Sequence, residues 1–319
     1  MKPRKVWAVY FSGTGTTEKT VCRIAEGIAK ALRTDFGTFS YTLPESRQEV
    51  LRFSIDDLVV FGAPVYAGRV PNVLLPYLKE KVRGCGAMAV PVVLFGNRNY
   101  DDALIELRNI LRDDGFIPVA AAAFVGEHSF STTLGGGRPD AEDLALMDDF
   151  ALQVAQKVGS IRAPEEEMTV DVRGHDPVRP YYTPRDRAGN PINILKVKPK
   201  TDAAKCSGCG WCADHCPMGS ISRENPAEVR GICIKCCACV KGCPTGAKYY
   251  DDEGYLYHQH ELEEGYARRA EAELFLLKYM VKRSSQKGRP LLYQACIRRK
   301  KHRGRASVFF MTGSIKTWR

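Results

Sequence analysis

The sequence predicts an α/β protein joined to a second, small, cysteine-rich domain. In the first 160 residues, short apolar runs alternate with amphipathic helical patterns. Nine of the twelve cysteines fall between Cys206 and Cys243, both included. A length of 319 residues also suggests two domains rather than one.

The N-terminal domain is expected over residues 1–160. Its apolar runs, rich in Val, Ala and Phe, span 5–11, 57–62, 88–95 and 117–125. Helical periodicity falls between and after them, at 18–32, 73–82, 101–113 and 141–158. Short buried strands separated by amphipathic helices predict a doubly wound parallel sheet with helices on both faces.

The remaining chain divides by composition. Pro, Arg, Gly and Asn crowd residues 161–200, which predicts a linker or an extended arm. The cysteine-rich domain is expected at 201–250, a polar, partly helical extension at 251–277, and a basic tail at 278–319. From Leu274 to Arg319 there are thirteen Lys or Arg and no Asp or Glu, so the rest of the chain carries a net charge of −3.

Composition also excludes some classes of function. No run of about 18 apolar residues exists, so no membrane span is expected. The apolar run near the N-terminus is too short for a signal peptide, which predicts a cytoplasmic protein. The basic tail is expected to be solvated; the alternative is a docking arm for an acidic protein partner. A nucleic-acid partner is not expected because the tail has too few interleaved aromatic residues for a stacking platform.

The clustered cysteines form an internal repeat. The stretches CSGCGWCADHCPMGS and CIKCCACVKGCPTGA align with an offset of 27 residues, and each contains C-x-x-C-x-x-C-x-x-x-C-P. In the bacterial form of this run, three cysteines ligate one [4Fe–4S] cluster and the fourth ligates the other. One predicted set is therefore Cys206, Cys209, Cys212 and Cys243. The other is Cys233, Cys236, Cys239 and Cys216.

Structural zinc is the alternative for these cysteines. Zinc sites use pairs of C-x-x-C, but not two tandem four-cysteine runs that each end in Cys-Pro. The repeat therefore favours iron–sulfur clusters. Cys237 is an additional cysteine inside the second run, and we expect it to be a spectator thiol.

A glycine- and hydroxyl-rich loop, Ser12-Gly13-Thr14-Gly15-Thr16-Thr17, follows the first strand and precedes a helix. A helix N-terminus offers free N–H groups and the positive end of a dipole, which suits a phosphate. The loop matches neither a P-loop nor a dinucleotide fingerprint, because Glu18 stands where the third glycine would be. A turn that only caps the helix is the alternative.

The pattern S-x-T-G-x-T in this loop resembles flavodoxin, where it holds the phosphate of FMN. The resemblance implies a flavodoxin-like sheet of five parallel strands and two further flavin-contacting loops. In them Tyr66 is the first candidate to stack on the flavin and Tyr100 the second. The implied cofactor-binding residues are Ser12, Gly13, Thr14, Gly15, Thr16, Thr17, Pro64, Val65, Tyr66, Ala67, Gly68, Gly96, Asn97 and Tyr100.

Residues 201–250 are similar to the bacterial two-cluster ferredoxins, small α+β domains. Over about residues 5–275 the chain resembles the flavodoxin–ferredoxin fusion proteins, found mostly in anaerobic bacteria and archaea. The resemblance implies two [4Fe–4S] clusters, one FMN, electron transfer between them, and other redox proteins as partners.

Two other functions stay open. The chain could be a flavin-dependent reductase of a small acceptor, fed by the clusters. That activity needs a pocket above the flavin and a proton donor such as His128 or Tyr100. The third possibility is a redox sensor whose basic tail binds a target. No residue is assigned a catalytic role.

Overall fold

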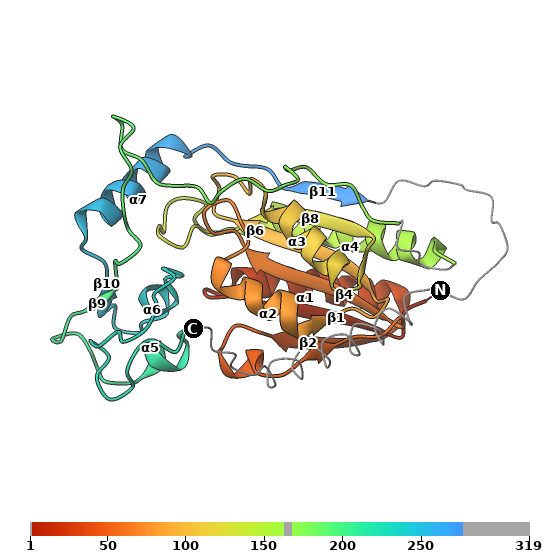
Figure 1. Cartoon of the computed structure of the whole chain (residues 1–319), viewed down its shortest axis with the longest axis horizontal. Coiled ribbons are helices and arrows are strands. Elements are labelled where there is room, and N and C mark those ends of the chain that lie inside the picture. The colour runs from red at the N-terminus through yellow and green to blue at the C-terminus, as the bar shows by residue number, and fades with distance from the viewer. Residues whose placement is uncertain (1, 163–167, 277–319) are drawn as a thin grey trace, which may run out of the picture.

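A sheet of parallel strands forms the centre of the N-terminal domain (Figure 1). The computed structural model describes residues 2–162 and 168–276. The five main strands are β1 (Lys5–Tyr10), β2 (Asp35–Ser40), β4 (Asp57–Pro64), β6 (Met88–Phe95) and β8 (Ala120–Val125). They lie in the order β2-β1-β4-β6-β8 with every neighbouring pair parallel, which is the flavodoxin-like order. This confirms the predicted fold class.

Helices cover both faces of the sheet because both faces of its strands are apolar; every residue of β6 is buried. On one face lie α1 (Thr16–Leu32) and α4 (Ala141–Ser160), which pack Ile24 and Phe150 into one core. On the other lie η2 (Asn72–Leu74), α2 (Leu75–Lys81) and α3 (Ala103–Asp113). The minor elements are η1 (Glu45–Arg47), β7 (Ile117–Pro118) beside β6, and the pair of β3 (Leu51–Arg52) with β5 (Val82–Arg83).

An arm beginning at residue 168 crosses the N-terminal domain, from Pro118 beside Val170 to the loops at the carboxyl end of the sheet, which residues 179–182 contact. Its anchor is Asp102, which is 1% exposed and accepts hydrogen bonds from the backbone N–H and the guanidinium of Arg179. Tyr181 donates to the carbonyl of Val70 at 2.7 Å, and the N–H of Tyr182 donates to the carbonyl of Ala67 at 2.8 Å. The arm is therefore fastened to the N-terminal domain.

The cysteine-rich module follows the arm. Its ends are joined by β9 (Lys200–Thr201), which pairs antiparallel with β10 (Lys248–Tyr249). Between them are two single-turn helices, α5 (Trp211–Asp214) and α6 (Ala238–Lys241).

The chain then returns to the N-terminal domain. Of residues 251–277, expected as a helical extension, residues 251–276 are described, and they form α7 (Glu253–Gly265) and then an extended segment that ends in β11 (Glu273–Leu276). β11 pairs antiparallel with β8 and covers that edge of the sheet, as Figure 1 shows in blue. The predicted tail at 278–319 lies outside the described residues. None of the described helices is long and apolar enough to cross a membrane.

Candidate cofactor sites

The two predicted cysteine sets surround two separate cavities. Cys216, Cys233, Cys236 and Cys239 line one cavity, which encloses about 360 Å³ of empty space and is otherwise walled mostly by apolar side chains. We call it the inner cavity. The other set, Cys206, Cys209, Cys212 and Cys243, lines a second cavity of about 310 Å³, the outer cavity. Each cavity thus takes three cysteines from one run and the fourth from the other.

The two runs share their backbone conformation as well as their spacing. Gly208 and Gly210 have φ of 69° and 74°, and the residues 27 positions later, Lys235 and Cys237, have φ of 55° and 58°. Gly210 and Cys237 are the N-caps of α5 and α6. The left-handed turns that wrap each run around its cavity are therefore the same, although the second run makes them without glycine.

Backbone amides also reach the crossover sulfurs at equivalent places. The N–H of Ser220 donates to Sγ of Cys216 at 3.4 Å, and the N–H of Ala247 donates to Sγ of Cys243 at 3.2 Å. Burial acts to raise the pKa of Cys243, but hydrogen bonds from Thr245, Ala247 and Lys248 outweigh it and lower that pKa to about 7. Such amides stabilise a thiolate and an electron-rich cluster.

The arrangement of sulfurs around a volume suits a cluster with one thiolate at each iron. Among the residues that the structure describes, no three His, Cys, Asp or Glu side chains are placed to hold a single metal ion. Cys237 is buried in the wall of the inner cavity, with its sulfur 3.3 Å from the hydroxyl of Tyr255.

The loop of residues 12–17 joins β1 to α1 as a closed turn. Gly15, with φ of 87°, is the N-cap of α1. The hydroxyl of Ser12 accepts from the N–H of Glu18 at 3.2 Å, and the N–H of Ser12 donates to Oγ1 of Thr42 at 2.9 Å. Ser12 and Gly15 thus shape the turn, while Gly13, Thr14, Thr16 and Thr17 line a cavity beside it.

This third cavity lies at the carboxyl ends of β1, β4, β6 and β8, where doubly wound folds bind ligands. It contains about 480 Å³ of empty space, part of which is open to solvent. Besides the 12–17 loop, its wall contains Pro64, Val65, Tyr66, Leu94, Phe95, Gly96, Gly126, Glu127, His128, Ser129 and Cys236. We call it the loop cavity.

Other predicted flavin contacts lie away from the loop cavity. Tyr100 is 1% exposed in the core and donates a hydrogen bond of 2.8 Å to Glu273 of β11. Asn97 is also buried, where it donates to the carbonyls of Tyr266 and Arg268, both at 2.7 Å. Ala67 and Gly68 face the arm and Asp101. The reason is that the arm and the returning C-terminal segment occupy the outer side of these loops.

His128, from the loop after β8, is a cavity residue with a defined hydrogen-bonding pattern. Its Nδ1 accepts from the N–H of Phe130 at 3.1 Å, so the proton of the neutral ring is on Nε2. The ring packs against Gly96, where an added Cβ would lie 2.3 Å from its Cδ2. Burial, together with the positive charges of Lys241 and Arg98, lowers the pKa of His128 to about 4.

Cys236 belongs to the walls of both the inner cavity and the loop cavity. A Cβ built on Gly13 would lie only 3.1 Å from Cβ of Cys236 and 3.6 Å from its sulfur. A predicted cluster-ligand position therefore touches the 12–17 loop directly, a contact that neither motif shows in sequence.

Two basic side chains hold the cysteine module against the sheet domain. Lys241 of α6 pairs with Glu127 and also donates to the carbonyls of His128 and Ser131, at 2.7 and 2.8 Å. Arg47 donates to the carbonyl of Thr42 and to that of Pro217, both at 2.6 Å. These contacts flank the Gly13–Cys236 approach.

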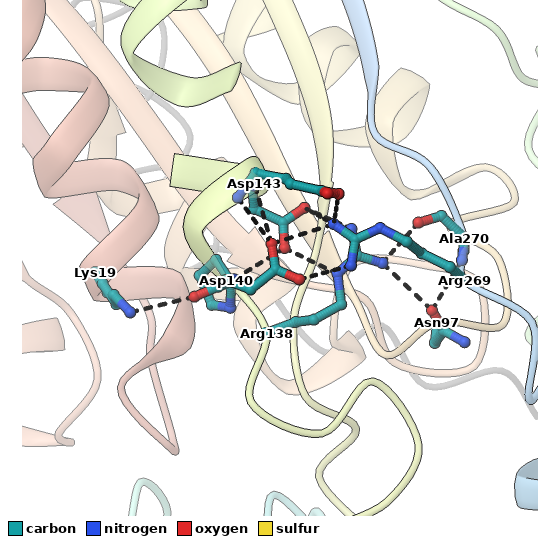
Figure 2. A network of polar contacts seen from close by, with 9 residues as sticks. Lys19, Asn97, Arg138, Asp140, Asp143, Arg269 and Ala270 are labelled. Atoms are coloured by element: carbon teal, nitrogen blue, oxygen red, sulfur yellow. Dashed lines mark hydrogen bonds and ion pairs between the residues drawn. The ribbon is translucent and has the colours of Figure 1, made fainter. Parts of the chain in front are cut away.

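A buried polar network fixes the loop after β8 to the returning segment (Figure 2). The side chain of Arg138 is 5% exposed, forms a two-pronged pair with Asp143, and donates to the carbonyl of Ala270 at 2.6 Å. Arg269 donates to Asp140, the N-cap of α4, at 2.6 Å. The loop after β8, which forms one wall of the loop cavity, is therefore held in place by residues 269–270, which follow the cysteine module in the chain.

Comparisons with known proteins identify part of the chain. A family model described as a 4Fe-4S binding domain matches residues 199–222, a span that contains the first cysteine run. No curated protein matches the chain.

Several solved structures are similar to the N-terminal half of the chain. One is a flavodoxin from the domain Archaea, 16% identical, with a TM-score of 0.35, covering 49% of this chain and 99% of its own. Another is a Fusobacterium nucleatum flavodoxin variant bound to flavin mononucleotide, 19% identical, with a TM-score of 0.32, covering 49% and 95%. A third is the rubredoxin oxygen:oxidoreductase of the anaerobe Desulfovibrio gigas, 18% identical, with a TM-score of 0.33, covering 50% and 37%. The chain thus combines a 4Fe–4S binding domain with a flavodoxin-like sheet, which supports a redox electron-transfer role.

Proposed function

We propose that this chain transfers electrons within one molecule between two [4Fe–4S] clusters and an FMN, and that it acts as a redox carrier between protein partners. The inner cluster is ligated by Cys216, Cys233, Cys236 and Cys239, and the outer cluster by Cys206, Cys209, Cys212 and Cys243. The observation that carries the proposal is the position of Cys236, which lines both the inner cavity and the loop cavity.

The loop cavity offers the groups that FMN needs. Thr14, Thr16 and Thr17 present hydroxyls at the N-terminus of α1, where a phosphate is favoured. Tyr66 lies in the wall beside them, and burial raises the pKa of its hydroxyl well above the ordinary value, so it remains a hydrogen-bond donor. Flavin exchanges one or two electrons, and each cluster exchanges one. Flavin and clusters together can therefore convert two-electron transfer into one-electron transfer and the reverse.

A reductase acting on a small acceptor is the second candidate, because the loop cavity is partly open and contains His128. That reaction needs an acid near neutral pH. The pKa of His128 is lowered to about 4 by burial and by Lys241, and Glu127 is paired with Lys241. The acid–base character of these two side chains therefore favours the carrier over the reductase.

The first test is the iron, acid-labile sulfide and flavin content of anaerobically purified protein. The proposal predicts about eight iron, about eight sulfide and about one FMN per chain. About eight iron without flavin, even after FMN is added, would mean that the 12–17 loop only caps α1.

The second test is rapid mixing with a small-molecule reductant. Flavin reduction should follow cluster reduction at a rate that is independent of protein concentration, because both cofactors belong to one molecule. Reoxidation of the reduced protein by quinones, nitro compounds or enoates should not saturate. Saturable kinetics with one of them would replace the carrier by the reductase.

A further inference from the structure

The two most exposed large hydrophobic side chains among the described residues belong to segments that meet at the rim of the inner cavity. Leu195 is 79% exposed and Ile232 is 63% exposed. Ile232 lines the inner cavity next to Cys233. Lys235 donates to the carbonyls of Leu195 and Cys233, at 3.1 and 2.9 Å, which holds the two segments together. The exposed apolar surface is thus attached to a cluster-ligand loop.

The charge around this rim is positive. Lys196 and Lys198 are exposed and have no ion-pair partner among the residues that the structure describes. Lys198 donates to the carbonyl of Val229, another residue of the cavity wall, at 2.7 Å. The nearby carboxylates are neutralised, since Asp251 pairs with Lys200 and Glu228 with Arg230.

Resting on the proposed function, we propose that Leu195, Ile232, Lys196 and Lys198 form a docking surface for a small electron-carrier protein with an acidic ring around its own cofactor. An apolar centre supplies most of the binding free energy, and complementary charges at the rim steer the encounter. The 278–319 tail carries Lys and Arg without Asp or Glu, so it has the wrong sign to cover this surface.

The position of the surface defines the electron-transfer step. One electron leaves the reduced cofactor of the carrier, which is oxidised, and enters the inner cluster, which is reduced; no proton moves. Because Cys236 of the inner cluster also lines the loop cavity, the carrier delivers its electron to the cluster beside the flavin. The outer cluster then lies off this route and stores a further electron.

The test uses the full-length holoprotein and, as the probe, a purified acidic two-cluster ferredoxin that has been reduced and freed of excess reductant. The second-order rate constant of cluster reduction is measured by stopped flow at low and high salt. It should fall as salt is added. The double variant Lys196→Glu/Lys198→Glu should be about tenfold slower at low salt, and Leu195→Glu should still be about tenfold slower at high salt, where its added charge is screened and the lost apolar contact remains.

Two matched controls separate local from general effects. Lys30→Glu changes one exposed charge on α1, and Leu152→Glu changes an exposed apolar residue of α4 that is 52% exposed. Both should keep the wild-type rate. Iron content and reduction by a small-molecule reductant should be unchanged in every variant, because none of these residues is a cluster ligand.

Wild-type rates in both the Leu195 and the lysine variants would overturn the docking surface while leaving the proposed function intact. A rate that rises with salt would also overturn it. Purified protein without iron would instead overturn the proposed function, and the docking surface with it. A concentration-dependent dimer in sedimentation that Leu195→Glu abolishes would assign this face to a second copy of the chain.

Discussion

Gly13 and Cys236 approach each other so closely that a side chain on Gly13 would contact the cysteine: an added Cβ would lie 3.1 Å from Cβ of Cys236. The two residues are more than 200 positions apart and belong to the two domains that the sequence separates. A Cβ at this distance is tightly packed, so any side chain at position 13 would push the 12–17 loop and the Cys236 loop apart by a few tenths of an ångström.

Gly13→Val should therefore separate the two domains locally. Overpacking of this kind costs about 1–3 kcal/mol. We expect about tenfold weaker FMN binding and slower flavin reduction by the clusters, with iron content unchanged. Fluorescence titration with FMN and stopped flow measure these effects. Gly159→Ala is the matched control, since an added Cβ there meets nothing within 4 Å. Equal FMN affinity in both variants would contradict the contact.

The two predicted ligand sets, each with three cysteines from one run and one from the other, predict different effects for a ligand cysteine and for a cysteine outside both sets. Cys243→Ser should remove one ligand of the outer cluster and lower the iron content from about eight to about four per chain. The inner cluster should still reduce the flavin. Cys237→Ser, which changes a buried cysteine outside both sets, should keep about eight iron. Iron analysis and electron paramagnetic resonance of the reduced protein check this, and an unchanged iron content in Cys243→Ser would refute the assignment.

Lys241 should be needed for the position of the loop after β8 rather than for cluster assembly. Its side chain pairs with Glu127 and donates to two carbonyls of that loop. Charge-assisted hydrogen bonds contribute about 1.5–3 kcal/mol each. In Lys241→Met, amide hydrogen exchange in residues 126–138 should be at least about tenfold faster, with normal iron content. Lys205→Met, which loses only the exposed pair with Asp202, should leave that exchange unchanged.

Arg138→Met should destabilise the N-terminal domain strongly. It leaves the carboxylate of Asp143, which is 3% exposed, without its two-pronged partner and with only Arg269 at 3.7 Å, and removing one member of a buried pair costs about 3–5 kcal/mol. Arg23→Met breaks the exposed pair with Asp148 and should cost less than about 1 kcal/mol. Chemical unfolding followed by circular dichroism compares the two. Equal losses of unfolding free energy in the two variants would show that the network in Figure 2 stabilises the domain no more than an exposed ion pair does.

The stability of the protein should fall in mild acid because of His128. Its pKa is about 4 in the folded protein, lowered first by burial and then by Lys241. In the unfolded chain the same side chain binds a proton near pH 6.5. Above that pH the contribution of His128 to the free energy of unfolding is fully present, and it is lost as the pH falls towards 4. Between pH 7 and pH 5 the loss should be about 2 kcal/mol. His128→Asn should remove about that much of the pH dependence in chemical unfolding at the two pH values. An identical pH dependence would contradict the shift.

The sequence predicts the main strands well because their signal is local, and the cysteine sets, which rest on equally local spacing, stay a prediction. Spacing within each run determines which cysteines can wrap one cavity, and β6 shows a continuous apolar run because it is buried on both faces. β2 has no such run: it is an edge strand whose first residues, Asp35 and Phe36, are exposed. Its place in the sheet comes from pairing with β1 rather than from its own composition.

Long-range contacts explain what the sequence does not show. The Glu273–Leu276 segment becomes a strand only because β8 offers it an edge. Tyr100 follows a flavodoxin-like loop, yet its hydroxyl reaches Glu273 of that same returning strand. The approach of Cys236 to Gly13 likewise depends on how two domains pack. The two members of each pair are too far apart in the sequence for hydrophobic periodicity or motif spacing to relate them.

The return of the chain to β8 has a consequence for biosynthesis. The ribosome makes the chain from its N-terminus, and domains fold as they emerge. β11 is synthesised after both cysteine runs, so the sheet begun by β1 cannot cover its β8 edge until the whole cysteine module has left the ribosome. During that interval β8 is an open edge that can pair with other chains. The newly made sheet domain is therefore open to aggregation until β11 has paired with β8.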